Sequence, residues 1–465
     1  MVKRVLKYAG LVALIYSLYV SASAVVPPLF HKKTTEKERD RVYQTALKET
    51  GNTEFPVERA LSIDENQEAL LWRLRLVEAA KERLILTTFD FRDEGGGRDM
   101  MAALWNAAER GVKIQILVDG INADLGLAHS DNFCQLSSHG NIEVKFYNPI
   151  NFLAPWKINY RMHDKYLIAD DLGYILGGRN TDNRFLGNYV EYYNEDRDIL
   201  VYETDPGKGK SFLQLEAYFN QIWKEPCSKP FRKKGDGGQL SEHYMKLREM
   251  YPEAFTTTDW ESATIDTNSI DLCTHTTGAK NKEPWIWDRM VEEMKKASDV
   301  QVQTPYIICS KKMYQDLKEI TDGGTSVEIV INAVENGTNP FGCTDYLNQK
   351  KKLRNTGVHI YEYLGKQAEH TKTVLADDRI SIVGSCNFDM RSVYLDTEMM
   401  LVIDSPELNA QIRSQIENMK VKCRHMQPDG MVLDGKDYHL PEQSWQKKLL
   451  YGILRVIIVP IRHLL

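Results

Sequence analysis

Two stretches of this chain repeat one pattern of polar residues. Residues 163–180 read HDKYLIADDLGYILGGRN, and residues 370–387 read HTKTVLADDRISIVGSCN. Both fit the pattern HxK(x)4D(x)6G[SG]xN, whose first three polar positions are His163, Lys165 and Asp170 in one copy and His370, Lys372 and Asp377 in the other. Two copies with identical internal spacing rarely arise by chance. The chain is therefore expected to consist of two related halves.

The sequence around both copies has the periodicity of an α/β fold. Helices are expected over residues 69–81 and 100–110, and strands over residues 84–89 and 112–118. The same order returns from Val291, with a helix over residues 313–321 and a strand over residues 327–332. The repeated unit is much longer than a solenoid repeat, so it indicates duplicated α/β lobes.

The expected organisation follows from the repeat and from shifts in composition. The polar, glycine-bearing stretch SKPFRKKGDGGQLSE (residues 228–242) indicates an exposed connection between the lobes. The predicted parts are a membrane anchor or signal segment (1–40), a first lobe (41–227), the connection (228–262), a second lobe (263–425) and an amphipathic C-terminal tail (426–465).

Composition excludes some classes of protein. Of 465 residues, 42% are hydrophobic and 27% charged, as in ordinary globular proteins, and the formal charge of −6 disfavours a protein built to neutralise nucleic acid. The seven cysteines are widely spaced, without CxxC pairs, so a structural zinc site is not expected. Whether any of them form disulfides stays open.

The N-terminus is apolar. Lys3, Arg4 and Lys7 precede an uncharged stretch, residues 8–30, which is long enough for a membrane-spanning helix of about 20 residues. The small residues at 22–24 also fit a cleaved signal peptide. In both cases the positive charges stay in the cytoplasm and the bulk of the chain lies on the outer side.

The repeated motif has the chemistry of phosphodiester transfer. In an HxK strand the imidazole and the ammonium point to one face. The lysines can bind phosphate oxygens, and one histidine can attack phosphorus while the other protonates the leaving alkoxide. The turns that close each copy supply Gly178, Asn180, Ser385 and Asn387 as candidate phosphate ligands, and the candidate carboxylate partners of the imidazoles are Glu398 and either Asp196 or Asp198. Neither a metal nor a cofactor is expected.

The doubled motif resembles that of the phospholipase D superfamily, and the resemblance covers nearly all of the chain after residue 60. It implies two phospholipase D-like α/β lobes with the active site at their interface. It also implies a phosphohistidine intermediate, with His163 as nucleophile and His370 as acid and base, although the sequence does not distinguish the two. Asp170 and Asp377, which belong to the catalytic motif, look by resemblance like framework residues that hold the motif turn and bridge the lobes.

Two further segments indicate a membrane. SWQKKLLYGILRVIIVPIRHLL (residues 444–465) has the basic and apolar faces of an interfacial helix broken at Pro460, although a helix docked on the lobes is the alternative. NFLAPWKINYRMH (residues 151–163) brings apolar side chains to the mouth of the expected site, or forms a buried loop. Within the superfamily this layout resembles the bacterial cardiolipin synthases.

The expected activity is therefore that of a membrane-anchored phosphatidyl transferase, which makes cardiolipin from phosphatidylglycerol. The expected location is the bacterial cell membrane, with a single N-terminal anchor and the lobes on the outer side. The expected partners are phospholipid and the bilayer, without nucleic acid or an obligate protein partner. The alternatives are hydrolysis of phospholipids to phosphatidic acid, an exported nuclease of the same superfamily and a non-catalytic binding protein.

Overall fold

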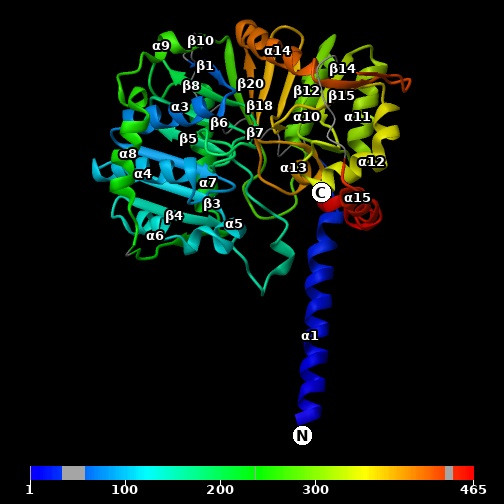
Figure 1. The fold of residues 1–465 in the computed structure, drawn as a ribbon, viewed down its shortest axis with the longest axis horizontal. Coiled ribbons are helices and arrows are strands. Elements are labelled where there is room, and N and C mark those ends of the chain that lie inside the picture. Colours follow the sequence, from blue (N-terminus) through cyan, green and yellow to red (C-terminus); the bar gives the residue numbers. More distant parts are fainter. Residues whose placement is uncertain (1, 34–57, 236, 435–442) are drawn as a thin grey trace.

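The computed structural model describes residues 2–33, 58–235, 237–434 and 443–465. Two α/β halves lie side by side, and a single long helix projects from the body between them (Figure 1). Each half is built on a nine-stranded mixed sheet. The expected fold class, two duplicated α/β lobes with an N-terminal apolar helix, is confirmed. The expected boundary at residues 40 and 41 lies outside the described residues.

The two sheets have corresponding strand orders. The first sheet contains β1 (Glu58–Ile63), β2 (Arg83–Thr88), β3 (Lys113–Asp119), β4 (Ile142–Tyr147), β5 (Tyr166–Ala169), β6 (Gly173–Gly177), β8 (Asp198–Glu203), β9 (Ser228–Phe231) and β10 (Ile265–Asp266). The second contains β11 (Ser269–Thr274), β12 (Asp299–Gln303), β14 (Ser326–Asn332), β15 (His359–Tyr363), β17 (Thr373–Ala376), β18 (Ile380–Gly384), β20 (Met399–Asp404), β21 (Cys423–Met426) and β22 (Val432–Asp434). Apart from the edge strands β10 and β22, the order β1-β8-β6-β5-β2-β3-β4-β9 matches β11-β20-β18-β17-β12-β14-β15-β21.

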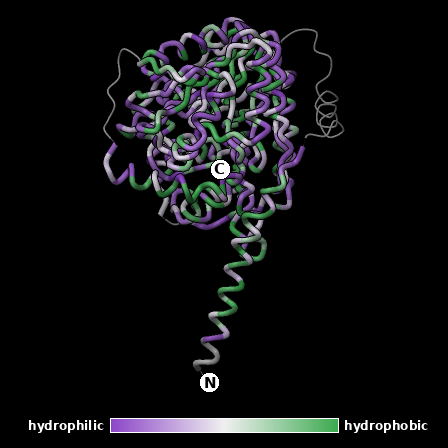
Figure 2. The backbone as a smooth tube through the Cα atoms, turned by 90° about the vertical axis from the view of Figure 1, so that its right-hand side faces the viewer, coloured by the Kyte–Doolittle hydropathy of each residue, from purple (hydrophilic) through white to green (hydrophobic). Residues whose placement is uncertain are grey.

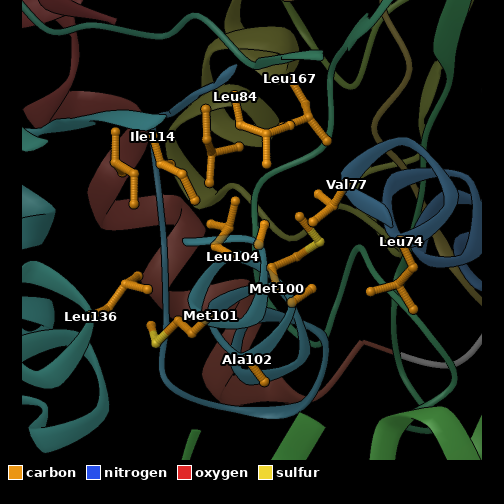
Figure 3. Close-up of a cluster of buried hydrophobic side chains, with 14 of the residues drawn as sticks. Leu74, Val77, Leu84, Met100, Met101, Ala102, Leu104, Ile114, Leu136 and Leu167 are labelled. Atoms are coloured by element: carbon orange, nitrogen blue, oxygen red, sulfur yellow. The ribbon is translucent and has the colours of Figure 1, made fainter. Parts of the chain in front are cut away.

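Each sheet is covered by helices on its outer face. On the first half these are α3 (Asn66–Ala79), α4 (Gly95–Glu109), α6 (Asp131–Ser138) and α8 (Leu240–Met250), and on the second half α10 (Trp285–Lys296), α11 (Lys311–Asp322) and α12 (Pro340–Arg354). Figure 3 shows the first of these cores, to which Leu74 of α3, Met100 of α4 and Ile114 of β3 belong. The helices end within a few residues of the positions that apolar periodicity predicts.

A third apolar core joins the two halves. Alternate strand residues face opposite sides, so Ile116 of β3 lies in the outer core whereas Leu117 lies in the inner one. The inner core contains Phe212 of α7 (Lys210–Lys224) and Ile412 of α14 (Pro406–Lys420). Because α7 contacts β11 and α14 contacts β1, each helix packs on the sheet of the other half. This exchange brings the two repeated motifs to one interface.

The segment expected to be an exposed connection is part of the first half. Residues 228–231 form β9, which pairs antiparallel with β4 at the edge of the first sheet. Helix α8 packs on α4. Just beyond the expected connection, β10 pairs with β1 and so also belongs to the first sheet. The polar sequence is compatible with this position because an edge strand exposes alternate side chains to solvent.

The N-terminal helix α1 (Val2–Val25) leaves the body as an isolated rod (Figures 1 and 2). Residues 7–29 have a mean hydropathy of 1.9, and none of the α1 residues in this stretch is buried, so α1 is not a core helix. Its base is fixed to the body. Asn159 Nδ2 donates to the carbonyl of Ala24 at 2.6 Å, and His463 Nε2 lies 2.9 Å from the carbonyl of Val25.

The C-terminal tail forms a helix that docks on the second half, which is the alternative that the sequence left open, and its place at a membrane surface stays a prediction. Helix α15 (Trp445–Ile457) docks on α12 and buries Tyr451. Its other face leaves Trp445 and Val456 more than two-thirds exposed. Figure 1 shows α15 beside the end of α1 that meets the body. After α15 a 3₁₀ turn (Val459–Leu464) carries Pro460. None of the seven cysteines, all of which lie in the described part of the chain, forms a disulfide.

Candidate active site

The two HxK segments lie at the interface, each against a segment of the other half. The peptide N–H of His163 donates to the carbonyl of Thr397 at 3.1 Å, and that of His370 donates to the carbonyl of Glu195 at 2.7 Å. The short strands β16 (Ala368–Glu369) and β7 (Asn194–Glu195) pair in parallel beside the second contact. Both segments precede their strands, because β5 begins at Tyr166 and β17 at Thr373. The expectation that the HxK residues lie within the strands was therefore wrong.

Each imidazole contacts a carboxylate of the other half. His163 Nδ1 lies 2.9 Å from Glu398 Oε1, and His370 Nδ1 lies 2.6 Å from Asp196 Oδ2. Of the two candidates in the first half, Asp196 is therefore the partner. Asp198 instead forms ion pairs with Arg73 and Arg179, at 2.9 and 3.3 Å, inside the first half.

The lysines of the motifs are buried beside the histidines. Lys165 Nζ donates to the carbonyl of His163, Lys372 Nζ donates to that of His370, and Lys372 Nζ also lies 2.7 Å from His370 Nδ1. Burial lowers the pKa of Lys165 to about 7 although Glu398 acts to raise it, and burial lowers the pKa of Lys372 as well. The two ammonium groups place positive potential at the interface.

The two imidazole–carboxylate pairs differ in the protonation state that the carboxylate favours. Burial and the Lys165 ammonium hold the pKa of His163 well below its usual range, and burial with Lys372 lowers the pKa of His370 to about 4, against the opposing effect of Asp196. Burial raises the pKa of Glu398 well above its usual value. Burial acts on Asp196 in the same direction, but Lys372 and His370 outweigh it and hold that pKa below its usual value. Asp196 is therefore the ionised partner, whereas Glu398 favours its neutral form.

Both imidazoles open into one cavity of about 400 Å³. Phe89 packs edge-on against the ring of His163 and Phe185 against that of His370, with ring centroids 5.0 Å apart in each case. Asn180 also lines the cavity, and its Oδ1 has no hydrogen-bond partner among the described residues. Asn387 Nδ2 lies 3.3 Å from Ser392 Oγ, and its Oδ1 is likewise without a described partner. Asn180 thus retains hydrogen-bonding capacity at the cavity into which the histidines open, and Asn387 lies 3.5 Å from the hydroxyl of Tyr306, which lines the same cavity.

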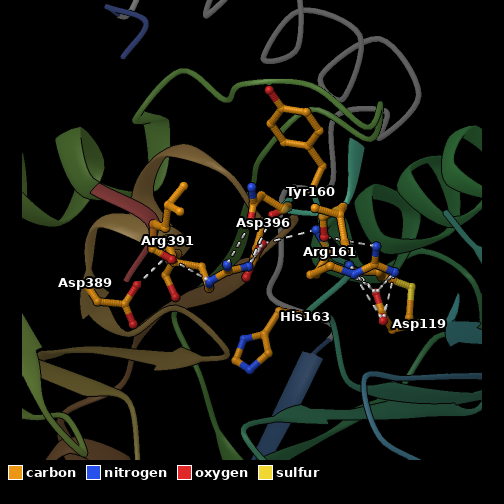
Figure 4. A network of polar contacts seen from close by, with 12 residues as sticks. Asp119, Tyr160, Arg161, His163, Asp389, Arg391 and Asp396 are labelled. Atoms are coloured by element: carbon orange, nitrogen blue, oxygen red, sulfur yellow. Dashed lines mark hydrogen bonds and ion pairs between the residues drawn. The ribbon is translucent and has the colours of Figure 1, made fainter. Parts of the chain in front are cut away.

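A polar network that the sequence analysis missed fixes the segment before His163. Arg161 forms a two-pronged contact with Asp119, with Nε and Nη2 each 2.9 Å from a carboxylate oxygen, and its peptide N–H donates to Asp396 Oδ1 at 3.1 Å. Arg391 reaches the same Asp396 oxygen from the second half (Figure 4). In the sequence these are scattered single charges, so no local pattern identifies them.

Two candidate phosphate ligands have other contacts. Ser385 is fully buried, donates its hydroxyl to Glu398 Oε2 and accepts from the peptide N–H of Met399 at 3.1 Å. Gly178 is buried against the carboxylate of Asp196. Each of the two positions therefore contacts the carboxylate partner of a histidine, and a contact with phosphate stays a prediction.

The aspartates of the motifs lie at the far ends of β5 and β17 from the histidines. Asp170, with φ +46°, accepts from the peptide N–H groups of Lys81, Glu82 and Arg83, at 2.7 to 3.0 Å. Asp377, with φ +49°, accepts from those of Ser298 and Asp299. Each aspartate closes a turn within its own half. They neither bridge the lobes nor lie beside the histidines.

The described residues contain no group of three or more His, Cys, Asp or Glu side chains that could hold a metal ion. The arrangement therefore offers two imidazoles and the Asn180 amide at one cavity, with two ammonium groups buried beside the imidazoles. Such a set can bind a phosphate diester, attack its phosphorus and transfer a proton to the departing oxygen.

Comparisons with known proteins agree with this chemistry. A family model described as "Cardiolipin synthase, PLD-like domain" matches residues 74–223 and 290–420. Cardiolipin synthase C of Escherichia coli K12 is 25% identical over 401 residues, covering 76% of this chain and 82% of its own. A protein of Helicobacter pylori 26695, described as uncharacterized, is 25% identical over 466 residues and covers 90% and 89%. The crystal structure of phosphatidylserine synthase of Haemophilus influenzae Rd KW20 has the same fold, with a TM-score of 0.61, 15% identity and coverage of 89% and 96%.

Proposed function

Because the chain belongs to the family of phospholipase D-like cardiolipin synthase domains, we propose that it transfers a phosphatidyl group from phosphatidylglycerol to a second phospholipid and so makes cardiolipin. That it is an enzyme of phospholipid metabolism follows from the family. The choice of donor and acceptor is the proposal. The observation that carries it is the pair of imidazoles in one cavity, each held at Nδ1 by a carboxylate of the other half.

In the first step, His163 Nε2 attacks the phosphorus of phosphatidylglycerol. A P–N bond forms as the P–O bond to glycerol breaks, and the imidazolium of His370 gives its proton to the departing oxygen. Glycerol leaves as a neutral alcohol, and His370 is left neutral. Lys165, Lys372 and the two asparagines stabilise the charge that develops on the phosphate oxygens.

In the second step, neutral His370 takes the proton of the acceptor hydroxyl while its oxygen attacks phosphorus. The P–N bond breaks and His163 is restored. Two molecules of phosphatidylglycerol thus give one cardiolipin and one glycerol. A water molecule in the acceptor position would instead give phosphatidic acid.

The difference between the two carboxylates supports this division of roles. An imidazolium is favoured beside an ionised carboxylate, and Asp196 acts to raise the pKa of His370. Glu398 favours its neutral form. It can therefore orient the His163 ring without the negative charge that would favour protonation of His163. Position 370 is therefore the better acid and base, and position 163 the better nucleophile.

The proposed location is the membrane surface. Helix α1 can anchor the chain, and the loop before the first motif exposes Phe152 by 74% and Leu153 by 86% near its base. The hydroxyl of Tyr16 of α1 donates to the carbonyl of Phe152, which brings this loop to the side of the helix. With the exposed apolar face of α15, these side chains favour contact with the headgroup region of a bilayer. We propose that the lobes lie on the outer side of the cytoplasmic membrane.

The test is product analysis with purified full-length protein in phosphatidylglycerol vesicles. We expect cardiolipin and free glycerol from the wild type. We also expect a phosphohistidine on residue 163 when the wild-type protein is quenched during turnover with acid-free denaturant and digested for mass spectrometry. His163→Ala should abolish both products. Release of phosphatidic acid alone would establish hydrolysis, and a covalent adduct on His370 would reverse the roles.

A further inference from the structure

The repeated motif extends beyond its asparagines, and the two halves use the extension differently. Residues 180–184 read NTDNR and residues 387–391 read NFDMR, so an arginine follows each asparagine at the same spacing. The side chain of the second arginine, Arg391, is engaged in hydrogen bonds within the protein. Its side chain contacts the carbonyls of Leu464 and Asn159 at 3.0 and 3.2 Å, in addition to Asp396.

The side chain of the first arginine, Arg184, has fewer contacts among the described residues. Its side chain is 47% exposed, and its one described ion pair is with Asp182, at 4.0 Å from Nε to Oδ1. Asp182 is itself buried, and burial raises its pKa to about 6. The Arg184 guanidinium therefore keeps donors that can bind a ligand.

Arg184 lines the catalytic cavity together with both histidines. Of the described residues around this cavity, it alone carries a permanent charge, and none of them is a carboxylate. The cavity is also bordered by the N-terminus of α12, where Asn339 caps the helix. The positive end of the helix dipole and the guanidinium thus both favour an anion there.

The two lysines are already assigned to the phosphate that reacts. They are 2% exposed and lie beside the histidine carbonyls, whereas Arg184 reaches solvent at the mouth of the cavity. A transfer between two phospholipids places two phosphates in the site, separated by the glycerol that will bridge them. Water and free glycerol bring no second phosphate.

We infer that Arg184, assisted by the N-terminus of α12, binds the phosphate of the acceptor phospholipid and so selects a lipid over water or a neutral alcohol. This rests on the proposed function. A guanidinium can donate two parallel hydrogen bonds to phosphate, which would hold the acceptor hydroxyl in line with the phosphorus on His163. Arg184 is in this sense a specificity residue for the second step.

The test compares two acceptors in one assay. Full-length protein in phosphatidylglycerol vesicles is supplied with labelled glycerol, and both cardiolipin formation and label exchanged into phosphatidylglycerol are measured. We expect Arg184→Gln to lower cardiolipin formation by about ten-fold or more, as for loss of a hydrogen bond to a charged group, with glycerol exchange unchanged. Arg184→Lys should restore part of the loss, because it keeps the charge without the two-pronged geometry.

Arg379 provides a matched control, since its side chain is 61% exposed and pairs with Asp404 on the β17–β18 side of the second half. Arg379→Gln should leave both reactions unchanged. Equal loss of both reactions in Arg184→Gln would place Arg184 on the donor phosphate, and no loss of either would remove it from the reaction; both results overturn the inference. Wild-type protein that exchanges glycerol but makes no cardiolipin would reject the proposed function itself.

Discussion

The carboxylate of Asp196 occupies the space into which any side chain at position 178 would project. A Cβ added to Gly178 would lie 2.3 Å from Asp196 Oδ1, well inside contact distance. The corresponding position of the second half, Ser385, fits its own side chain because the hydroxyl hydrogen-bonds to Glu398. The two halves therefore hold their histidine partners by different means.

Gly178→Ser should displace Asp196 from His370. Because the contact between this carboxylate and the imidazole is lost or misaligned, we expect cardiolipin formation to fall by about ten-fold or more, as for a hydrogen bond to a charged group. Rates on phosphatidylglycerol and near-ultraviolet circular dichroism should be compared with wild type. A folded Gly178→Ser protein with undiminished rate would contradict this account of the glycine.

Ser385→Ala should remove the donor to Glu398 Oε2 and leave a buried carboxyl oxygen without it. The expected loss is again about ten-fold, through misplacement of His163. Ser381 of β18 is a matched control, since it is equally buried and its hydroxyl has no described partner. Ser381→Ala should change the rate little, and comparable losses in the two variants would point to a packing effect instead.

Asp196→Asn should change the pH profile as well as the rate. Asp196 raises the pKa of His370, so its neutralisation should lower that pKa further. In the variant, His370 then loses its proton at a lower pH than in the wild type. The alkaline limb of the pH–rate profile should therefore shift to lower pH. Glu398→Gln serves for comparison, because Glu398 favours its neutral form and its replacement should move this limb less. Equal shifts in both variants would remove the assignment of His370 as acid.

Activity should survive chelators. In the proposed mechanism the negative charge of the phosphate is stabilised by Lys165, Lys372 and the amide groups of Asn180 and Asn387. Chelation leaves these side chains in place. The rate should be measured with EDTA on detergent-dissolved phosphatidylglycerol, where metal effects on lipid packing are absent. Complete loss that one particular metal restores would contradict the proposed mechanism.

The lobes should be accessible from outside the cytoplasmic membrane. Lys3, Arg4 and Lys7 are expected to hold the start of α1 inside. Protease added to intact spheroplasts should then digest the lobes, with a cytoplasmic marker protein as the control for leakage. Protection of the lobes until the membrane is broken would place the active site in the cytoplasm.

Much of the fold could be predicted because its determinants are local. Apolar periodicity gave the helices and strands around each motif, and the identical spacing of the two motifs gave the duplication. The edge strand β9 escaped prediction because its sequence is polar and its pairing with β4 joins distant parts of the chain. Arg184 could have been found from the sequence, since NxDxR follows both copies, but only the cavity distinguishes it from Arg391.

The sequence by itself determined that two histidines and two lysines occupy equivalent positions in a duplicated α/β framework, because the covalent chain fixes the spacing within each motif. It left open whether Asp196 or Asp198 contacts an imidazole, and it did not indicate that the Ser385 hydroxyl donates to Glu398. Tertiary structure decided these points. The contacts of His163 with Glu398 and of His370 with Asp196 join residues 235 and 174 positions apart. They exist only because α7 and α14 each pack on the opposite sheet and bury the apolar faces that hold the two halves together.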